Sequence, residues 1–537
     1  LIIIPSACEE YLAEDFRDGL SPATFYNSDA EAQIAVDGAY SILKGPGWFA
    51  HRDRPAWWQI AADEISSTRN IFKEAHNITY DEGVADGERY WNTLYETVRN
   101  TSDAIKNISG NDKLSQNSKD HSLGQLYVLR ALAYYDLTCV WGDVPFFTEI
   151  LAPEELASLE RTPVKTIRDA MIADLQTAYG LLPDSWSGSD LGRMTKWAAR
   201  ALEAKFHMFA KNWQGMLTAC KDIIDNSPHT LMEDFGDVYD WSNATFSNKV
   251  KPEHILWIDF TGLPAAGLNT NNEQDYQRGH DFVPRLRDEP KDKKGRQNEL
   301  KAALAANGHE FGGYGGGSPL PLLADRSSWD AGDLRYDLTI TGEYEGIPLK
   351  FKYLKKLWNL STTYSPRGNK MENFVMIRLA DIYLMAGEAE NELNGPGNAY
   401  QYVNKVRERA FEPDQPWSGM TQQEFREEMY EERLHELCGE SHRKPDLVRW
   451  GIYVEHIRNT VFQKHNAPAA QNVQDKHQYA PIPLTEIQLN PNLLNTDPTN
   501  NGYRSVSYTH LRAHETPEHL GLRLLVEKKN RGGGGGG

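Results

Sequence analysis

The sequence predicts an all-α fold, a superhelix of helical repeats that carries long irregular loop insertions. Apolar residues recur at helical spacing in a series of segments between about 29 and 438, and most of these segments come in pairs. Two stretches, about 45–87 and 230–373, lose this period and gain Gly, Pro, Asn and Asp. We therefore expect a scaffold of paired helices at about 28–230 and 374–460, interrupted by two insertions that carry function, as long loops usually do.

The first helix is expected at about 29–44. Ser28 and Glu31 have the spacing of a capping box, and Gly45-Pro46-Gly47 ends the apolar period. A later helix is expected to begin with Thr162 as its cap and Pro163 in its first turn. The other expected helices span about 88–108, 122–140, 163–181, 195–210, 213–226, 374–393, 398–410 and 421–438.

One helix pair fits the 34-residue tetratricopeptide register. Ala204, Trp213 and Pro228 lie at the consensus spacing within residues 197–228. The segment 378–410 repeats the design, with Gly395-Pro396-Gly397 between its helices. Stacked hairpins of this kind bury a continuous core and often leave their insertions on a binding face, so the sequence predicts a tetratricopeptide-like superhelix.

The charge balance argues against nucleic acid as a partner. The 537 residues contain 57 Lys and Arg against 76 Asp and Glu, a net charge of −19, so no basic field is available to hold a phosphate backbone. No apolar run approaches the length of a membrane span. Four cysteines in a chain of this length do not make a disulfide scaffold, and Cys139, Cys220 and Cys438 are expected to pack as small apolar residues.

Both ends of the sequence carry special signals. Residues 1–7 form an apolar run that ends in small residues before Cys8, which is typical of the end of a lipoprotein signal peptide, so Cys8 is the expected lipidation site. Glu9 and Glu10 resemble a surface-export signal. Residues 504–537 end in six glycines and resemble a translated sequencing adapter, and we expect them to be a non-native tail. The expected single domain is therefore 8–503.

No template for catalysis, cofactor binding or metal binding is complete. Gly45–Ala50 mimics a dinucleotide-binding loop but follows a helix, and His435-Glu436 lacks the second histidine of a zinc site. We expect no enzyme activity, no cofactor and no metal. Paired carboxylates are the hardest to exclude, and the candidates are Asp63 with Glu64 and Asp330 with Asp333.

Several segments together resemble the SusD/RagB family, the outer-membrane glycan-binding lipoproteins of Bacteroidetes polysaccharide-utilisation systems. The resemblance spans nearly the whole chain from Cys8 to Tyr503. It rests on Leu129–Leu137, Trp141–Pro145, Arg378–Leu384, Glu432-Arg433, Glu440–Arg443, Asp446–Gly451, Ile482-Pro483 and Asn490–Asn492.

Apart from the resemblance, the charged residues in these segments are expected to have mainly structural roles. Arg130, Asp136 and Asp143 lie on or just after a helix, where charged residues usually cap or pair. The expected buried ion network near the C-terminal helices consists of Glu440, Arg443, Asp446 and Arg449.

The resemblance implies a lipid-anchored, surface-exposed protein of the outer membrane. It would capture oligosaccharide or polysaccharide without hydrolysing it and pass it to a SusC-like TonB-dependent transporter. Two alternatives stay open: a RagB-like adaptor that binds peptides or proteins, and a glycoside hydrolase on a helical scaffold.

A glycan receptor needs exposed aromatic rings beside hydrogen-bonding side chains, because a sugar has apolar faces and hydroxyl edges. Both insertions offer such residues. Aromatic residues on helical period, namely Trp91, Trp197, Trp213 and Trp450, are expected in the core. The predicted glycan-binding residues are Trp48, Trp57, Trp58, Asp63, Arg69, Asn70, Tyr276, Arg285, Tyr314 and Trp329, with Phe49 beside Trp48.

Overall fold

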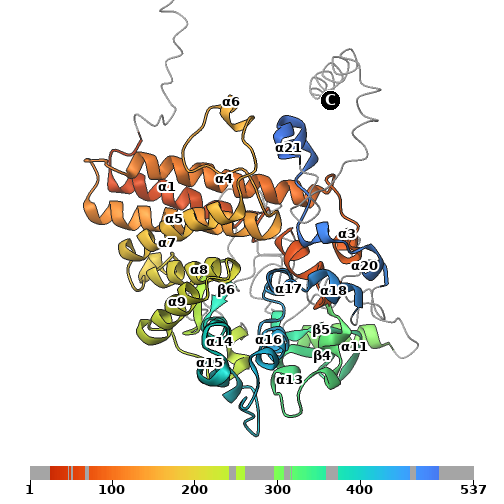
Figure 1. Ribbon diagram of the computed structural model, residues 1–537. Coiled ribbons are helices and arrows are strands. Elements are labelled where there is room, and N and C mark those ends of the chain that lie inside the picture. The colour runs from red at the N-terminus through yellow and green to blue at the C-terminus, as the bar shows by residue number, and fades with distance from the viewer. Residues whose placement is uncertain are drawn as a thin grey trace, which may run out of the picture.

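Helices make up most of the described chain (Figure 1), which confirms the predicted fold class. Among the residues that the structure describes, the strands form three short antiparallel pairs. The computed structural model describes residues 25–45, 47–49, 53–66, 72–240, 250–260, 295–306, 315, 317–358, 373–459 and 467–494.

The scaffold is a series of long helices in which each helix up to α15 packs on a neighbour in the series, and α16 packs on α14. The series crosses from the first half of the chain to the second where α14 packs on α9. The scaffold helices are α1 (Asp29–Leu43), α4 (Ala85–Ile108), α5 (Gln116–Val140), α7 (Val164–Leu181), α8 (Lys196–Phe209), α9 (Trp213–Asn226), α14 (Leu379–Asn394), α15 (Pro396–Glu408) and α16 (Gln422–Leu437).

Local signals in the sequence fix most helix ends. The Ser28 hydroxyl accepts from the backbone N–H of Glu31, as the capping box requires. The start of α7 differs by one residue from the prediction. Pro163 stands before the helix, and the backbone N–H of Val164 donates to the carboxylate of Asp143 at 2.8 Å.

One predicted helix is wrong over its first turn. Residues Phe374–Arg378 form strand β6, which pairs antiparallel with β2 (His254–Ile258) before α14 begins. All residues of both strands are buried, and a short continuous apolar run cannot be assigned to helix or strand from its period alone.

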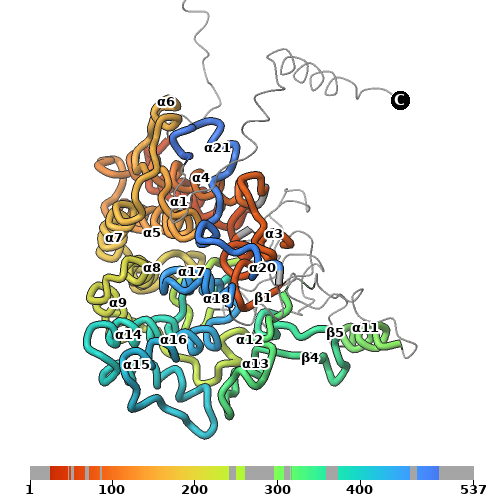
Figure 2. Tube along the Cα trace, turned by 45° about the vertical axis from the view of Figure 1, so that its right-hand side comes forward, coloured from red at the N-terminus to blue at the C-terminus, as the bar shows by residue number. Residues whose placement is uncertain are grey.

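The two insertions contain short ordered elements. Figure 2 shows the hairpin of β4 and β5 projecting from the body with α11 beside it. The first insertion holds α2 (Asp53–Pro55), the π-helical turn η1 (Ala56–Ile60), β1 (Ile65–Ser66) and α3 (Lys73–Asn77). The second holds η4 (Phe235–Tyr239), β2, α11 (Arg296–Ala306), β3 (Ser318–Pro319), α12 (Pro321–Ala324), η6 (Arg326–Ser328), α13 (Arg335–Thr339), β4 (Ile340–Tyr344), β5 (Ile347–Leu354) and η7 (Lys355–Leu357).

The two insertions contact each other and the C-terminal helices. Strand β1 of the first insertion pairs with β3 of the second, and α17 packs on η1 of the first. The remaining elements are α6 (Pro153–Leu156), η3 (Gly188–Asp190), α17 (Arg443–Trp450), α18 (Tyr453–Asn459), α20 (Ala467–Asn472), η8 (Asp475–Gln478), α21 (Leu484–Leu489) and η9 (Pro491–Leu493).

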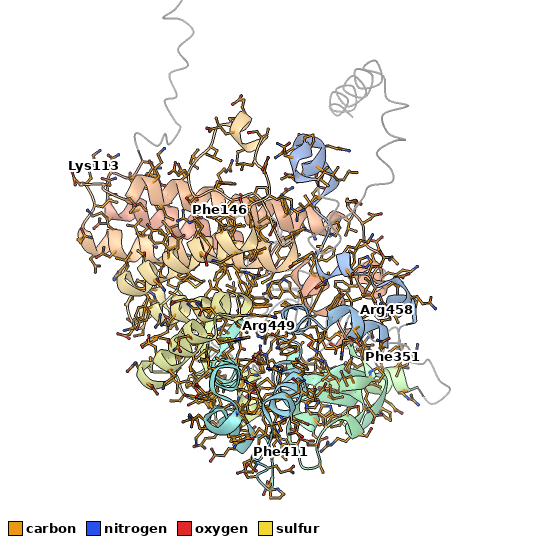
Figure 3. The ribbon with its side chains drawn as sticks, in the orientation of Figure 1. Lys113, Phe146, Phe351, Phe411, Arg449 and Arg458 are labelled. Carbon is orange, nitrogen blue, oxygen red and sulfur yellow. The ribbon has the colours of Figure 1, made fainter. Side chains whose placement is uncertain are left out.

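The predicted ion network is confirmed and lies in the interior. Arg449, labelled near the centre of Figure 3, bonds both carboxylate oxygens of Glu388 at 2.6 and 2.9 Å and also bonds Asp446 at 2.7 Å. Arg378 pairs with Glu440 at 2.9 Å. Buried charges of this kind are tolerated only when they are paired, and the network ties β6, α14, α16 and α17 together.

Candidate functional site

Three predicted glycan-binding tryptophans lie in the core. Trp48, Trp57 and Trp58 are 0%, 3% and 1% exposed, so they offer no platform to a sugar. The prediction of an exposed platform at these positions is wrong, because these rings pack into the main apolar core together with scaffold residues. Phe49 is also buried and stacks on Trp48, with ring centroids 5.1 Å apart.

A buried carboxylate explains why these rings point inward. Asp136 on α5 accepts from the Trp48 indole N–H at 2.8 Å and from the Tyr90 hydroxyl at 2.5 Å. Tyr90 in turn accepts from the Trp58 indole N–H at 3.2 Å. Arg54 pairs with the same carboxylate at 3.0 Å. Asp136 therefore anchors the first insertion to the scaffold, in agreement with the pairing role expected for it.

Trp329 is buried as well, at 5% exposure. Its indole N–H donates to the carbonyl of Leu323 at 2.9 Å, and its ring stacks on His435 with centroids 4.0 Å apart. This side chain joins the second insertion to α16. The prediction that it forms an exposed platform is wrong, because its ring also packs in the interior.

Asp63 and Glu64 also lie in the interior, at 2% and 1% exposure. Burial alone would raise the pKa of Asp63, but the charges of Arg443 and His456 hold it below its ordinary value. Burial and the neighbouring Asp63 raise the pKa of Glu64 to about 8. Such a split resembles an acid–base pair, yet a polysaccharide cannot reach either group, and Asp63 is fully engaged in ion pairs.

The other predicted contact residues, Arg69, Asn70, Tyr276, Arg285 and Tyr314, lie outside the described residues, as does Cys8. Their roles stay predictions. Among the tryptophans expected in the core, Trp91 and Trp197 are buried, whereas Trp213 and Trp450 are half-buried.

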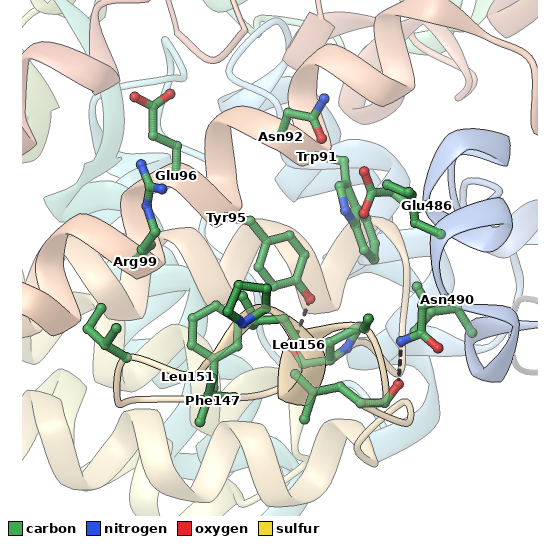
Figure 4. Close-up of a pocket in the computed structure, with 17 residues that line it drawn as sticks. Trp91, Asn92, Tyr95, Glu96, Arg99, Phe147, Leu151, Leu156, Glu486 and Asn490 are labelled. Carbon is green, nitrogen blue, oxygen red and sulfur yellow. Dashed lines mark hydrogen bonds between the residues drawn. The ribbon is translucent and has the colours of Figure 1, made fainter. Parts of the chain in front are cut away.

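A surface cleft of about 650 Å³ lies at one end of the scaffold (Figure 4). One wall is α4, the second is the segment 145–159 with α6, and the third is α21 with η9. In both Figure 1 and Figure 2, α6 and α21 stand at the same end of the molecule as α4. We call this cavity the α4 cleft. A large cavity with apolar walls and a few converging polar groups is the usual form of a ligand site.

Aromatic rings form the centre of the α4 cleft. The Tyr95 ring lies between Trp91 and Phe147 in Figure 4, with centroid distances of 4.8 and 6.0 Å. Tyr95 and Phe147 are nearly parallel, with an angle of 20° between their planes. The Tyr95 hydroxyl donates to the carbonyl of Pro145 at 2.7 Å, which fixes the ring in place. Two half-buried rings in one orientation can receive the apolar face of a sugar.

Polar side chains border these rings. Asn92, Glu96 and Arg99 are exposed on successive turns of α4 and provide hydrogen-bond donors and acceptors. On the opposite wall, burial raises the pKa of Glu486, although a hydrogen bond from the Trp91 side chain lowers it in part. Asn490 donates to the carbonyl of Leu159 at 2.7 Å and so holds two walls of the cleft together.

Aliphatic residues form the outer lip. Ile150, Leu156 and Leu489 are 41%, 37% and 73% exposed and all line the cleft. Exposed apolar side chains gathered at one place usually mark a contact with another molecule. The cleft therefore combines a sugar-compatible centre with a lip that also suits a protein surface.

The sequence reasoning missed this cleft. Trp91 and Tyr95 are one helical turn apart on the helix expected at 88–108, and exposed Asn92, Glu96 and Arg99 lie on the adjacent face. This juxtaposition of aromatic and polar residues on one helix is the local sequence signal for the cleft. The facing walls come from residues 145–159 and 484–493, which are distant in the sequence.

The described residues that line the cleft include no cysteine, serine, histidine or lysine. Within the described ranges, no group of three His, Cys, Asp or Glu side chains is arranged to hold a metal ion. None of the helices in the described ranges combines the length and apolar character that a membrane crossing needs.

Comparison with known families places two matches on the chain. Residues 332–503 match the model of the SusD family, and residues 42–208 match a model described as starch-binding associating with outer membrane. SusD-like protein P25 of Formosa agariphila is 39% identical over 94% of this chain and 98% of its own length.

Solved structures agree with the fold. A SusD homolog from Bacteroides thetaiotaomicron superposes with a TM-score of 0.74 at 18% identity, covering 88% of this chain and 97% of that one. The surface glycan-binding protein A of the same organism, in complex with laminarihexaose, gives 0.68 at 19% identity and covers 88% and 100%.

Proposed function

Because the chain belongs to the SusD family, a glycan-binding family associated with the outer membrane, we propose that it captures oligosaccharide or polysaccharide at the cell surface. The proposal includes delivery of the glycan to a SusC-like TonB-dependent transporter. Lipidation at Cys8 would hold the protein at the outer membrane, with its body facing outwards. Several acyl chains are needed for this, because a single chain binds a membrane only marginally.

The α4 cleft is the observation that supports this proposal best. Its parallel Tyr95 and Phe147 rings provide an apolar surface, and Asn92, Glu96 and Arg99 provide hydrogen-bonding groups beside it. A sugar needs both features in one place. The proposed role is binding without a chemical step, and the paired carboxylates Asp63 and Glu64 are enclosed in the protein and do not line the cleft.

Affinity electrophoresis tests the glycan role. The full chain with Cys8→Ser is run through gels that contain laminarin, starch or other plant, host and microbial polysaccharides. We expect one glycan class to retard it, and Tyr95→Ala to weaken the retardation about 10-fold or more, since an aromatic contact and its buried area are both lost.

Tyr400→Ala is the matched control. Tyr400 is a half-buried tyrosine on α15 that lines no part of the cleft, and its hydroxyl also bonds to backbone, at Met420. If Tyr400→Ala weakens retardation as much as Tyr95→Ala does, the effect is one of folding and the cleft is not the binding site.

The aliphatic lip favours a second candidate, the capture of peptides or proteins. Leu489 in particular exposes 73% of its surface beside the cleft, which a sugar does not require. Peptide capture would show binding that Leu489→Ser reduces and no retardation by any glycan.

A further inference from the structure

A buried tyrosine of the scaffold holds the loop that carries Phe147, and we call residues 145–148 the platform loop. Tyr134 lies on α5 and is 0% exposed. Its hydroxyl donates to the backbone carbonyl of Phe147 at 2.8 Å and accepts from the backbone N–H of the same residue at 3.0 Å. One hydroxyl therefore satisfies both backbone groups of the residue whose ring lines the α4 cleft.

Two further side chains hold the platform loop on either side of this position. The Tyr95 hydroxyl donates to the carbonyl of Pro145, as described above, and the Arg130 guanidinium donates to the carbonyl of Thr148 at 3.2 Å. Arg130 is 4% exposed, and Asp174 on α7 fixes its guanidinium with bonds of 2.8 and 3.0 Å. Side chains from α4 and α5 thus bond to three backbone positions of the loop.

The segment that follows the platform loop gives Phe147 little further support. Residues 152–158 are exposed, and the side-chain bond from the Ala152 N–H to Glu155 is local to that segment. The Phe147 ring is half-buried, so enclosure alone does not fix it. The bonds to Tyr134 are the direct hold on the backbone that carries this ring.

A platform of two rings depends on their relative position. Tyr95 is attached to a long helix, whereas Phe147 is attached to a loop. Binding that must first order a loop or a side chain loses affinity, so a ring that is fixed beforehand binds more tightly. If Phe147 moved away, a sugar would meet Tyr95 as a single ring.

We infer that Tyr134 is a positioning residue for glycan binding, whose hydroxyl holds the Phe147 backbone so that the Phe147 ring stays nearly parallel to Tyr95 in the free protein. The inference rests on the proposed glycan-binding function and extends the site to a residue that no glycan touches. It also gives a role at the cleft to the segment Leu129–Leu137, on which the family resemblance rests.

A double-mutant cycle tests whether Tyr134 acts through Phe147. The full chain with Cys8→Ser is run in gels that contain laminarin, starch, xylan, pectin or alginate, and affinity is taken from mobility against polysaccharide concentration. For the polysaccharide that binds, we expect Tyr134→Phe to weaken affinity about 3- to 10-fold, as the ordering of one side chain on binding implies. In a Phe147→Ala protein the same substitution should weaken it no further.

Tyr453→Phe is the matched control. Tyr453 is also buried, its hydroxyl donates to the backbone carbonyl of Ala61 at 2.7 Å, and it lines no part of the α4 cleft. A general effect of losing a buried tyrosine hydroxyl would appear in this variant too. We expect its affinity for the polysaccharide to equal that of the unmodified chain.

Fluorine NMR of the free protein follows the ring itself. With 3-fluorotyrosine labelling, the Tyr95 resonance is assigned from the peak that vanishes in Tyr95→Phe, and it senses the Phe147 ring 6.0 Å away. We expect this resonance to shift in Tyr134→Phe, because Phe147 loses its support, and to stay in place in Tyr453→Phe. A role of Tyr134 in general stability would not move it.

Unchanged affinity in Tyr134→Phe overturns the inference and leaves the proposed function intact, because the unmodified chain still binds. An equal loss with and without Phe147, or a loss that leaves the Tyr95 resonance in place, also overturns it, since Tyr134 then does not act through Phe147. No retardation of the unmodified chain by any of the five polysaccharides counts against the proposed function, and the inference then fails with it.

Discussion

Asp63 and Arg443 stand 380 residues apart in the sequence and meet in the interior as a two-bonded ion pair, with both N–O distances at 2.8 Å. Asp63 belongs to the first insertion and Arg443 begins α17. His456 on α18 lies 2.6 Å from the same carboxylate. The pair therefore joins the insertion to the C-terminal helices, of which α17 packs on the η1 turn that contains Trp57 and Trp58.

Replacing Asp63 tests whether this pair is structural. Asp63→Asn leaves the Arg443 guanidinium buried without its counter-charge, which typically costs about 3 to 5 kcal/mol. We expect a large decrease in the free energy of unfolding in urea, with glycan binding per folded molecule unchanged. Loss of binding without loss of stability would instead give Asp63 a direct role with ligand.

Glu64 predicts an unusual dependence of stability on pH. Its pKa in the folded protein is raised to about 8, above the ordinary value that it has in the unfolded chain. The folded state therefore holds a proton that the unfolded state releases, and stability decreases as the pH rises from about 4.5 to 8. Glu64→Gln has no carboxyl proton to lose, so this decrease in stability with pH should be absent from the variant. We expect its Tm to exceed that of the unmodified protein by about 2 °C or more at pH 8.

At pH 4 the same comparison should show a much smaller difference, because Glu64 is then protonated in the folded state and largely protonated in the unfolded state. Thermal unfolding at the two pH values checks the sign. A Glu64→Gln protein that is less stable at pH 8 would mean that the ionised carboxylate is stabilised in the folded state.

The aliphatic lip of the α4 cleft separates the two candidate ligand classes. Leu489→Ser removes an exposed apolar side chain whose loss should change stability by no more than about 0.5 kcal/mol. Under the glycan proposal, retardation in polysaccharide gels stays the same. A marked loss of retardation would show that Leu489 contacts the ligand and would shift the assignment toward an apolar one.

Membrane attachment is expected to depend on Cys8. Cys8→Ser, in the natural precursor and host, should move the protein from the outer-membrane fraction to the soluble fraction, because the acyl chains can no longer be attached. Cell fractionation and immunoblotting measure this. Persistence of the variant in the membrane fraction would contradict lipidation at Cys8.

Local sequence signals predicted the scaffold well. The helix expected at 213–226 is α9, Trp213–Asn226, and Ala204 is buried in the middle of α8 as the tetratricopeptide register requires. Such helices can be identified within one segment from the period of their apolar residues and from their capping residues. Strand β6 was missed because its identity depends on pairing with β2, which is remote in the sequence.

The site could not be predicted in the same way. Trp57 and Trp58 lie in a stretch with loop composition, and nothing nearby in the sequence shows that Tyr80 and Tyr90 enclose them. Conversely, Trp91 lies on helical period and was expected in the core, where most of its surface does lie, yet its ring also lines a cleft. Exposure of a ring depends on which distant segments pack around it, and sequence spacing does not contain that information.

The most direct test of the α4 cleft as the glycan site is a crystal structure of the full chain with the oligosaccharide that affinity electrophoresis selects. We expect a sugar ring resting on Tyr95 and Phe147, with its hydroxyls within hydrogen-bond distance of Asn92, Glu96 or Arg99. An α4 cleft that stays empty while the sugar occupies only other surfaces would contradict the assignment of this cleft as the glycan site.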